Sequence, residues 1–558
     1  MDSNYISWVD VLIVLGAALA AGPPLGSYIA RVFTNRPAFG DRFFNPIERA
    51  VFRILGVSPR ENMRLEEYLG GLLLVNLFVL VWIFVILFDQ GHWFPTPPGF
   101  TPMTWDLAFH SAASFTTNTD YTHFSNESSI TLWGGLLGLM LPFFTSAATG
   151  LAVGAAIARG FTRKDGTLGN VYVDLIRSIS RILLPLSILG AVVYLFMGVP
   201  DTLTAYVTAH PPGGTSFPIF LGPVAPWQSI ELLGTNGGGF YGANAASPLA
   251  TPTVFVALFG MILMMLLAFG FLFAFGYMIR RPAESYPYVG TAVLVFAIAL
   301  ILFTWFESSG NLLAAGFRFD YPADSSFQLT SVYTNTGATN LTIGSLQPVP
   351  QLVLLFGMFT QSTPGGDGTG FATLFINMVI AVFIGGLMVG RTPEYLGKKI
   401  GLSQVRWAAF VLLIHPVVIL LPTAVAYLGG YATFPGGPPA PFCSASTCVA
   451  AHHFTAVLYE FTSEAANNGS GYSPINDGTV FFNVVGALVM LVGRFAPILG
   501  MLVIASRFAN QDVVAPGAGT LHTASATFTI YLVLILVIST ALLFLPVMAL
   551  GPLSQLGS

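Results

Sequence analysis

Residues 226–243 read PWQSIELLGTNGGGFYGA, a short, half-apolar stretch that turns abruptly into threonine, asparagine and glycine. A helix needs about 20 apolar residues to cross the roughly 30 Å hydrocarbon core of a membrane, and this stretch is far shorter. It suits a re-entrant helix, which enters a membrane protein from one side, stops at depth among spanning helices and lets the chain return in extended form. The stretch therefore predicts a pore loop.

The same pattern occurs at three other places in the chain. The copies are WDLAFHSAASFTTNTD at 105–120, SSFQLTSVYTNTGATN at 325–340 and HFTAVLYEFTSEAANNGSGY at 453–472. One cluster of Gly, Asn and Thr would usually be only a turn between helices. Four clusters, each after a short apolar stretch and before a longer apolar run, favour a pore built from four loops.

A unit of helix, pore loop and helix crosses the membrane twice, so successive units lie parallel and can close into a ring. We expect an all-α membrane protein of about ten transmembrane helices. It would form a single transmembrane domain, with four repeats around a pseudo-fourfold pore and one extra helix at each end. The expected repeats are residues 66–159, 174–281, 284–391 and 404–507, and the extra helices are 1–31 and 523–550.

The composition also indicates a membrane protein. Hydrophobic residues make up 54% of the 558 residues and charged residues only 8%. A soluble domain carries about a quarter charged residues, so most of this surface faces lipid. The predicted spans are 7–30, 66–90, 129–158, 178–198, 252–279, 286–306, 349–390 (interrupted), 407–429, 479–505 and 525–548.

The basic residues predict the topology, because nearly all of the 21 Lys and Arg fall in alternate loops. Those loops are cytoplasmic by the positive-inside rule, which puts both termini outside the cytoplasm. We expect a multi-pass protein of the bacterial inner (plasma) membrane. The first apolar run lacks a basic segment before it, which favours a retained helix over a signal peptide. The basic loops are 31–64, 159–181, 280–281, 391–406 and 507.

The outer loops are acidic and carry a single cation, Arg318. An acidic vestibule concentrates cations and repels anions. The alternative, that outer loops merely lack Lys and Arg, explains the missing cations but not the excess of acids. The acids in question are Asp106, Asp120, Glu127, Asp201, Glu231, Glu307, Asp320, Asp324, Glu460, Glu464 and Asp477.

The residue types of the four loops suit a filter for a dehydrated alkali cation, which needs a ring of carbonyl oxygens in place of its water. Glycine lets carbonyls turn inward, and Thr and Asn add side-chain oxygens. Because no ring of carboxylates is required, the pattern favours a monovalent ion over calcium, and potassium in the filter is the only metal ion we expect. The expected potassium filter is Thr116, Thr117, Asn118, Thr119; Gly234, Thr235, Asn236, Gly237; Thr334, Asn335, Thr336, Gly337; Ala466, Asn467, Asn468 and Gly469.

The third residues of the aligned loops are taken as Thr119, Gly237, Gly337 and Gly469. The sequence GTNGGG at 234–239 is not a nucleotide loop, since no Gly-Lys-Ser/Thr follows it. We therefore expect this chain to bind neither nucleotide nor nucleic acid.

Arg494 is the one basic residue deep inside a predicted span, since Arg181, near the start of the span 178–198, is counted with the basic loop before it. A cation at that depth is costly, so a function is the default interpretation: a barrier in the pore that opposes exit of an ion to the cytoplasm. The alternative is a packing salt bridge to an acid on a neighbouring helix.

The span 349–390 is broken by PGGDGTG at 364–370. Irregular backbone at depth persists only beside protein or water, so this break predicts a gate or a coupling point, with a plain kink as the alternative. The residues expected to act there are Gly366, Asp367, Gly368 and Gly370.

Four other residues and one loop have less specific signals. For Cys443 and Cys448 a loop disulfide or two free thiols is favoured over a metal site. His110 and His415 are expected to be packing residues rather than ligands. The basic loop 391–406 either docks a partner or simply follows the positive-inside rule.

The chain resembles the KdpA family, the potassium-binding, channel-like subunit of the bacterial Kdp potassium-transporting ATPase. The resemblance extends from the first helix to the last, and GRTPEYLGKK is its most specific motif. The matching segments are LGTNGGGF (233–240), GLMVGRTPEYLGKKI (386–400), AANNGSGY (465–472), VGRF (492–495), TLGN (167–170) and FLPVMALGP (544–552).

The resemblance implies a place in a superfamily of potassium channels and transporters with four pore loops. It also implies a complex with a P-type ATPase catalytic subunit (KdpB-like) and with KdpC-like and small KdpF-like membrane subunits. The chain has no Asp-Lys-Thr-Gly and no Walker motif, so we expect a non-catalytic subunit. It departs from the family pattern at Asp120, at His123, in the third filter (TNTGATN) and at Glu464.

Two rival functions remain open at this point. The first is a stand-alone potassium channel or ion-coupled symporter of the same superfamily, against which GRTPEYLGKK and the two extra helices argue. The second is a scaffold subunit without an ion path, against which four polar loops at membrane depth argue.

Overall fold

The computed structural model describes residues 7–361, 363–390, 392–434, 446–513 and 521–557, and this part is almost entirely helical. Ten helical segments within it are long and apolar enough to cross a membrane, which confirms the predicted ten crossings. They are α1 (Trp8–Phe33), α3 (Leu65–Trp93), Leu132–Thr162 ending in α7 (Leu141–Thr162), Val171–Phe196 formed by α8 (Val171–Arg177), a π-helical turn and α9 (Leu184–Phe196), α11 (Val254–Met278), Pro282–Glu307 with α12 (Tyr286–Glu307), α15 (Thr369–Met388), α16 (Leu402–Leu428), α18 (Val480–Ala509) and α19 (Ala526–Leu550).

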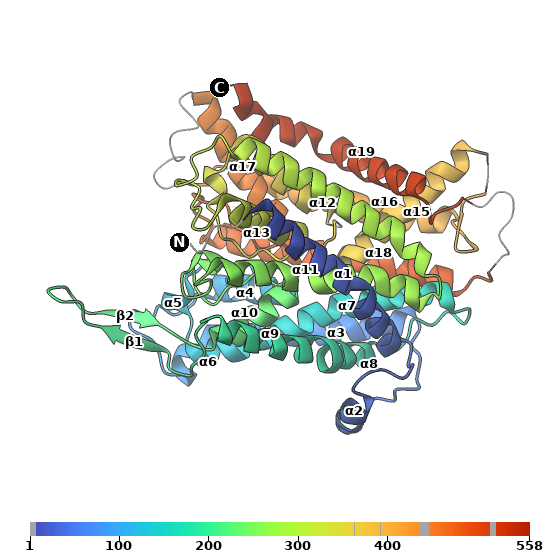
Figure 1. The fold of residues 1–558 in the computed structure, drawn as a ribbon, viewed down its shortest axis with the longest axis horizontal. Helices are drawn as coiled ribbons and strands as arrows, with labels where there is room; N and C mark the ends of the chain where they lie inside the picture. The colour runs from blue at the N-terminus through green and yellow to red at the C-terminus, as the bar shows by residue number, and fades with distance from the viewer. Residues whose placement is uncertain (1–6, 362, 391, 435–445, 514–520, 558) are drawn as a thin grey trace.

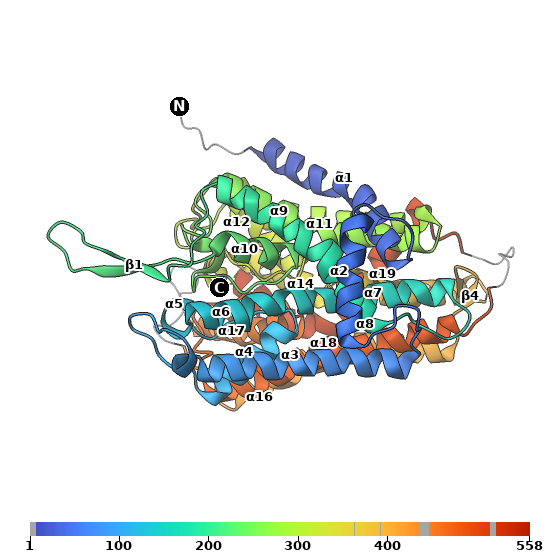
Figure 2. The same ribbon diagram turned by 90° about the horizontal axis from the view of Figure 1, so that it is seen from below.

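The axes of the long helices are roughly aligned across the bundle. The start of α1 and the end of α19 lie at the same end of it (Figure 1). At that end a hairpin of β1 (Tyr206–Ala209) and β2 (Phe217–Phe220) projects beyond the helices in both ribbon views (Figure 2). This is the end that the basic residues predict to be extracytoplasmic.

Each of the four loops begins with a helix that is not among the ten candidate spans. Three of these helices have 10 to 13 residues and are as short as the sequence predicted, whereas the fourth has 20 residues and is longer than predicted. These helices are α4 (Trp105–Thr116), α10 (Val224–Leu233), α13 (Tyr321–Tyr333) and α17 (Ser446–Ala465). The interrupted run at 349–390 consists of a short helix, α14 (Pro348–Thr360), a break, and then α15.

One predicted boundary is wrong. The fourth span begins at Val171 rather than near residue 178, because Asn170 caps it: its side-chain oxygen accepts the N–H groups of Tyr172 and Val173. Arg177 and Arg181, which the sequence assigned to a loop, therefore lie inside this helical segment, so Arg494 is not the only arginine within a span.

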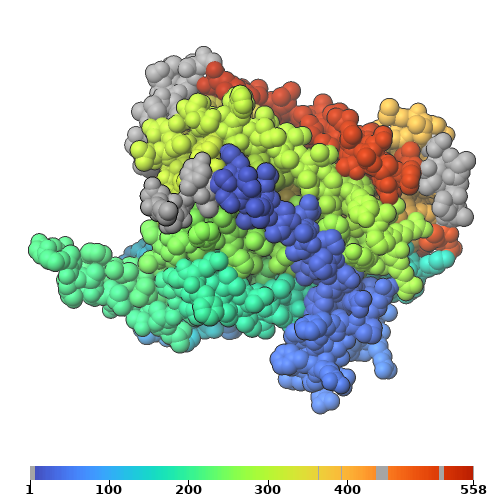
Figure 3. Space-filling model, in the orientation of Figure 1, coloured from blue at the N-terminus to red at the C-terminus, as the bar shows by residue number. Residues whose placement is uncertain are grey.

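Arg181 is accommodated because α2 (Asp41–Leu55) lies over the start of that helix. Its guanidinium forms ion pairs with Glu48 and, at 2.5 Å, with Asp41. The other face of α2 leaves Phe43 and Ile54 67% and 83% exposed. In the space-filling view α1 and α2, in blue, lie on the surface, and α2 projects below the bundle (Figure 3). An amphipathic helix in this position suits the membrane interface.

A second buried ion pair connects α7 with α8 and, through hydrogen bonds, with α3 and α1. Arg159, in the last turn of α7, makes a bidentate pair with Asp174 of α8 at 2.6 and 2.7 Å. Tyr68 of α3 donates to the same carboxylate at 2.9 Å, and Arg159 also donates to the carbonyl of Phe33 at the end of α1. The pair is therefore neutralised and hydrogen-bonded, as a buried pair must be.

Within the motif GRTPEYLGKK, residues 394–399 form a small hairpin of β3 (Glu394–Tyr395) and β4 (Lys398–Lys399). The Nζ atom of Lys398 donates to the carbonyls of Gly160 (2.9 Å), Arg163 (2.8 Å) and Phe508 (2.6 Å). One ammonium thus satisfies carbonyls at the ends of both α7 and α18. Lys398 is buried within its own chain and is not part of a surface that could dock a partner.

Candidate ion filter and the cavity beneath it

The four helices that precede the loops, α4, α10, α13 and α17, end in the same way. In each loop the third residue after the helix donates its backbone N–H back to a carbonyl in the last turn: Thr119 to Ser114, Asn236 to Glu231, Thr336 to Ser331 and Asn468 to Ser463, at 2.8 to 3.0 Å. This bond is typical of a helix that stops at a left-handed residue.

That left-handed residue is present in all four loops and is never a glycine. The φ angles are 62° for Asn118, 48° for Thr235, 52° for Asn335 and 53° for Asn467. Only a few per cent of non-glycine residues adopt such a conformation, so its occurrence at four matching places shows that the loops share one backbone shape.

This geometry corrects the alignment of the first loop by one residue. Thr119 matches Asn236, Thr336 and Asn468, and it is Asp120 that matches Gly237, Gly337 and Gly469. Thr116, which the sequence placed in the filter, is the last residue of α4. The prediction went wrong because the first loop has no glycine to mark the position.

The loops touch one another in a closed ring. A Cβ atom on Gly237 would collide with the carbonyl oxygen of Thr336, one on Gly337 with that of Asn468, and one on Gly469 with that of Thr119. These contacts join the second loop to the third, the third to the fourth and the fourth to the first, and they leave no room for a side chain.

Asparagine side chains close the remaining junction. Asn118 Nδ2 donates to the carbonyl of Thr235 at 2.7 Å, and Asn236 Nδ2 donates to Oδ2 of Asp120 at 2.8 Å. Asn335 Nδ2 donates in the corresponding way from the third loop to the carbonyl of Ala466, at 3.2 Å. The ring is therefore held by side-chain amides as well as by backbone contact.

Threonine hydroxyls support the loops from behind. Oγ1 of Thr117 lies 2.7 Å from Oγ1 of Thr119, and Thr334 and Thr336 form the same pair at 2.7 Å. Thr117 and Thr334 also donate to carbonyls of their own helices. In these two loops the hydroxyls are therefore bonded to the protein itself.

A cavity lies beneath the ring, and Asn118, Asn335 and Asn467 are among the residues that line it. Arg494 of α18 also lines this cavity. It is 7% exposed and donates to the carbonyl of Ser146 at 3.1 Å, while its Nε has no partner. Among the described residues no acid forms a direct ion pair with Arg494. A packing salt bridge therefore does not explain this arginine.

The break between α14 and α15 packs against the underside of the ring. The N–H of Gly365 donates to the carbonyl of Tyr333 at 2.9 Å, and that of Asp367 to Oγ1 of Thr235 at 3.1 Å. Gly368 has φ of 69°, and a side chain there would strike the carbonyl oxygen of Gly150. The Asp367 carboxylate is 3% exposed, and neither of its oxygens has a partner.

Comparison with known proteins places this arrangement in a family. The family model described as potassium-transporting ATPase A subunit, KdpA, matches residues 12–556. The chain belongs to the KdpA family. Relatives named potassium-transporting ATPase potassium-binding subunit include one from Nostoc sp., 37% identical over 98% of both chains, and one from Geobacillus kaustophilus, 36% identical over 95% of this chain and 96% of the relative.

A solved structure supports the same fold. The potassium transporter TrkH from Vibrio parahaemolyticus superposes with a TM-score of 0.51 over 89% of this chain and 97% of that chain, at 16% sequence identity. At that identity the likeness concerns the fold alone, and it agrees with the all-α membrane architecture of this KdpA chain.

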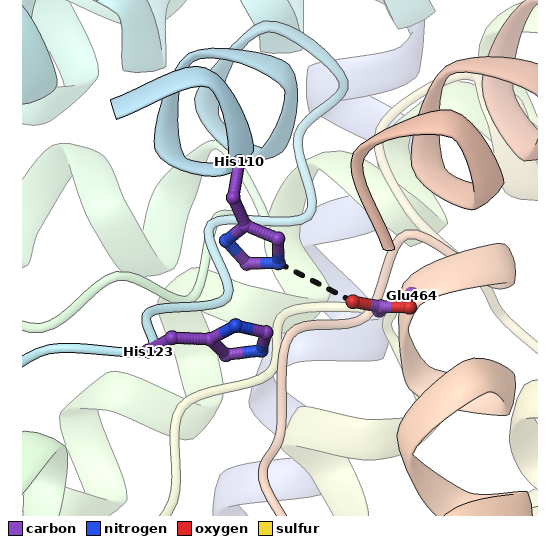
Figure 4. A group of neighbouring side chains, drawn as sticks. All are labelled: His110, His123 and Glu464. Atoms are coloured by element: carbon purple, nitrogen blue, oxygen red, sulfur yellow. Dashed lines mark hydrogen bonds and ion pairs between the residues drawn. The ribbon is translucent and has the colours of Figure 1, made fainter. Parts of the chain in front are cut away.

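Sequence reasoning did not predict where two acids of this KdpA chain lie. Asp120 belongs to the ring itself, and Glu464 lies fully buried behind it, with its Oε1 3.3 Å from Nε2 of His110 (Figure 4). The sequence shows both as acids of the outer loops and as departures from the family pattern. Cys443 lies outside the described residues, and so does the side chain of Cys448.

Proposed function

We propose that this chain is the potassium-binding, channel-like subunit of an ATP-driven potassium uptake complex. It takes potassium from the extracytoplasmic side, holds it in the ring of four loops and delivers it to a partner P-type ATPase subunit. The closed ring of four loops with one backbone shape is the observation that carries the proposal. The relatives' names, which include potassium binding and an ATPase, point the same way.

The ring suits potassium because four short helices point their carbonyl ends at it and their loops present further carbonyls. The proposed filter is the set of residues that the sequence predicted, except that Asp120 joins the first loop and Thr116 leaves it. A single carboxylate in the ring adds attraction for a cation without creating the multi-carboxylate site that calcium prefers.

We also infer the organisation of the chain from its helices. The units α3–α4–α7, α8/α9–α10–α11, α12–α13–α15 and α16–α17–α18 are the four repeats, and α1 and α19 are the extra helices. In each unit a helix outside the ten candidate spans lies between two of those spans. The chain lies in the inner membrane with both termini extracytoplasmic, as the basic loops favour.

Below the ring, Arg494 acts as the barrier to the cytoplasm, and the break with Gly366, Asp367, Gly368 and Gly370 acts as the gate or coupling point. Contacts from the break to Thr235 and Tyr333 support this role, because a movement there would reach the ring. The ion then leaves sideways to the KdpB-like subunit, and KdpC-like and KdpF-like subunits complete the assembly. The chain itself hydrolyses no ATP.

Reconstitution tests this function. Proteoliposomes that contain the chain with its ATPase partner should take up potassium when ATP is supplied, and neither subunit alone should do so. ATP hydrolysis should depend on potassium and should require the partner. Rapid passive potassium flux through the chain alone would instead favour a stand-alone channel, and hydrolysis by the chain alone would contradict the proposal.

A further inference from the structure

Three arginines line a cavity on the side of the molecule that the basic residues predict to be cytoplasmic. The cavity has a volume of about 490 Å³ and lies where α1, α7 and α11 end. Arg36 follows α1, and Arg280 and Arg281 form the turn between α11 and α12. The volume is within the range of about 300–1,000 Å³ that is usual for small-molecule sites.

The protein does not neutralise these three arginines. All three are exposed, and within the described part of the chain no acid forms an ion pair with any of them. Two acids near the cavity have other partners: Glu284 accepts a hydrogen bond from Thr523 at 2.8 Å, and Asp512 pairs with Lys164 at 3.1 Å. The guanidinium groups are therefore available to a ligand. The proposed function of the chain gives them no role.

Arg280 occupies a backbone position that usually belongs to glycine. It follows the residue that caps α11, and its φ is 58°. Its N–H donates to the carbonyl of Tyr277 at 3.2 Å, and that of Arg281 donates to the carbonyl of Gly276 at 2.9 Å, which is the Schellman motif. Residues with a Cβ are strained at this angle, so the arginine is held there at a cost in backbone energy. A ligand for its guanidinium accounts for that cost.

The charge of the cavity suits an anion. The carbonyl end of each helix carries about half a negative charge, so three helix ends offset only part of the positive charge of the arginines. A guanidinium presents paired N–H groups that match two oxygens of a phosphate group. The positive-inside rule accounts for basic residues on this side, but it accounts neither for their gathering around one cavity nor for an arginine in a glycine position.

The surroundings of the cavity favour a phospholipid as the source of the phosphate. The chain continues from Arg36 into α2, which crosses the direction of the long helices and so lies parallel to the membrane: it is seen end-on in Figure 1 and from the side in Figure 2. Phe39 and Phe43 are 88% and 67% exposed there, as suits the boundary between headgroups and acyl chains. Ile279 and Leu396 add apolar surface to the cavity. Basic pockets at this level bind the headgroups of anionic lipids.

We propose that Arg36, Arg280 and Arg281 bind the phosphate group of an anionic phospholipid from the cytoplasmic leaflet. The lipid connects the end of α1 to the turn between α11 and α12. These helices already pack closely, since a Cβ on Gly26 of α1 would collide with the carbonyl oxygen of Gly270 in α11. The lipid thus extends the attachment of the first helix to the rest of the bundle at the membrane surface.

The experiment uses the full chain, purified in a neutral detergent and washed free of native lipid. Phosphatidylglycerol is titrated in mixed micelles, and native mass spectrometry counts the lipid that stays bound. We expect one phosphatidylglycerol to be retained under conditions that remove phosphatidylcholine, and the thermal unfolding temperature to rise only with the anionic lipid. Inorganic phosphate and glycerol 3-phosphate should neither displace the lipid nor raise that temperature. If they do both, the site takes soluble phosphate compounds; if phosphatidylcholine is retained equally, the arginines do not select the lipid. Either result overturns the proposal.

Matched variants locate the lipid. Arg280→Gly removes a guanidinium but supplies the residue that its backbone favours, so the unfolding temperature without lipid should not fall. Its affinity for phosphatidylglycerol should nevertheless fall about tenfold, as should that of Arg281→Gln, because charge-assisted hydrogen bonds are lost. Arg60→Gln is the control, since Arg60 is an exposed arginine on the same side that does not line the cavity. Retention of the lipid by both cavity variants, or equal loss in Arg60→Gln, would contradict the proposal.

A last measurement separates the lipid from a protein partner. The complex with the ATPase subunit should retain the same phosphatidylglycerol as the chain alone. Release of the lipid on assembly would mean that acidic groups of the partner fill the cavity, and the proposal would be wrong. None of these readouts depends on potassium transport, so a negative result here leaves the proposed function as it stands.

Discussion

The side-chain amide of Asn236 donates a hydrogen bond of 2.8 Å to Oδ2 of Asp120, and it does so across the junction between the first and second pore loops. The same amide nitrogen lies 3.0 Å from the hydroxyl oxygen of Ser146 on α7. One asparagine therefore holds a carboxylate in the ring at the place where the other three loops have glycine. Oδ1 of Asp120 has no partner among the described residues.

The first prediction concerns this charge. Asp120→Asn keeps the size of the side chain but removes its charge, which at about 6 Å and an effective dielectric near 20 attracts a cation by roughly 3 kcal/mol. We expect the potassium concentration for half-maximal ATP hydrolysis by the complex to rise at least tenfold. Glu127→Gln, which removes an acid outside the ring, is the control. An unchanged half-maximal concentration in Asp120→Asn would exclude the carboxylate from ion binding.

The second prediction concerns the close approach of the loops. Gly337 has φ of 82°, and a Cβ there would collide with the carbonyl oxygen of Asn468. Gly337→Ala should therefore displace the carbonyl ring and abolish growth of a potassium-auxotrophic host at limiting potassium.

The control for Gly337 is in the same repeat. Gly316 also has φ of 82°, but its added Cβ would meet only Thr342, at 3.5 Å. Gly316→Ala thus carries the same backbone strain without the collision, and we expect near-normal uptake. Equal loss of uptake in both variants would mean that backbone strain, rather than the shape of the ring, explains the defect.

The third prediction concerns Arg494 in the cavity beneath the ring. A fixed positive charge opposes a potassium ion at about 8 Å by roughly 2 kcal/mol with an effective dielectric near 20. Arg494→Gln should let potassium leak passively or should raise the ATP consumed per ion, while Arg494→Lys should be milder. Flux into proteoliposomes without ATP and ATP turnover per ion are the measurements.

Arg507→Gln is the matched control for Arg494, since Arg507 is an exposed arginine in the last turn of the same helix. It should change neither quantity. If Arg494→Gln lowers only the thermal stability and leaves both flux and coupling as in the parent, the arginine serves packing alone.

The fourth prediction concerns Lys398, which bonds three carbonyls at the ends of α7 and α18. Lys398→Met leaves these carbonyls without a donor, and we expect the free energy of unfolding to fall by about 2–4 kcal/mol. The neighbouring Lys399 is exposed, so Lys399→Met should have little effect. Thermal unfolding of the purified chain compares them, and equal unfolding temperatures would show that the hydrogen bonds of Lys398 contribute nothing.

The spans and the short pore helices could be predicted from the sequence because both depend on local properties. The number of consecutive apolar residues decides whether a helix can cross the membrane, and the alternation of basic loops decides which side they face. The glycine positions of the second, third and fourth loops could also be predicted from the sequence, since glycine marks a position that admits no side chain.

The first loop was predicted one residue out of register because it has aspartate where the other loops have glycine, and only the shared backbone shape reveals the match. The carbonyls bonded by Lys398, the acceptor of Arg494 and the meeting of His110 with Glu464 were not predictable either. Each of these contacts joins residues more than 100 positions apart, and hydrophobic periodicity says nothing about which side chains of different helices meet at depth. The chain's apolar runs determine that it enters the membrane, whereas packing among the helices determines which polar groups face the ion.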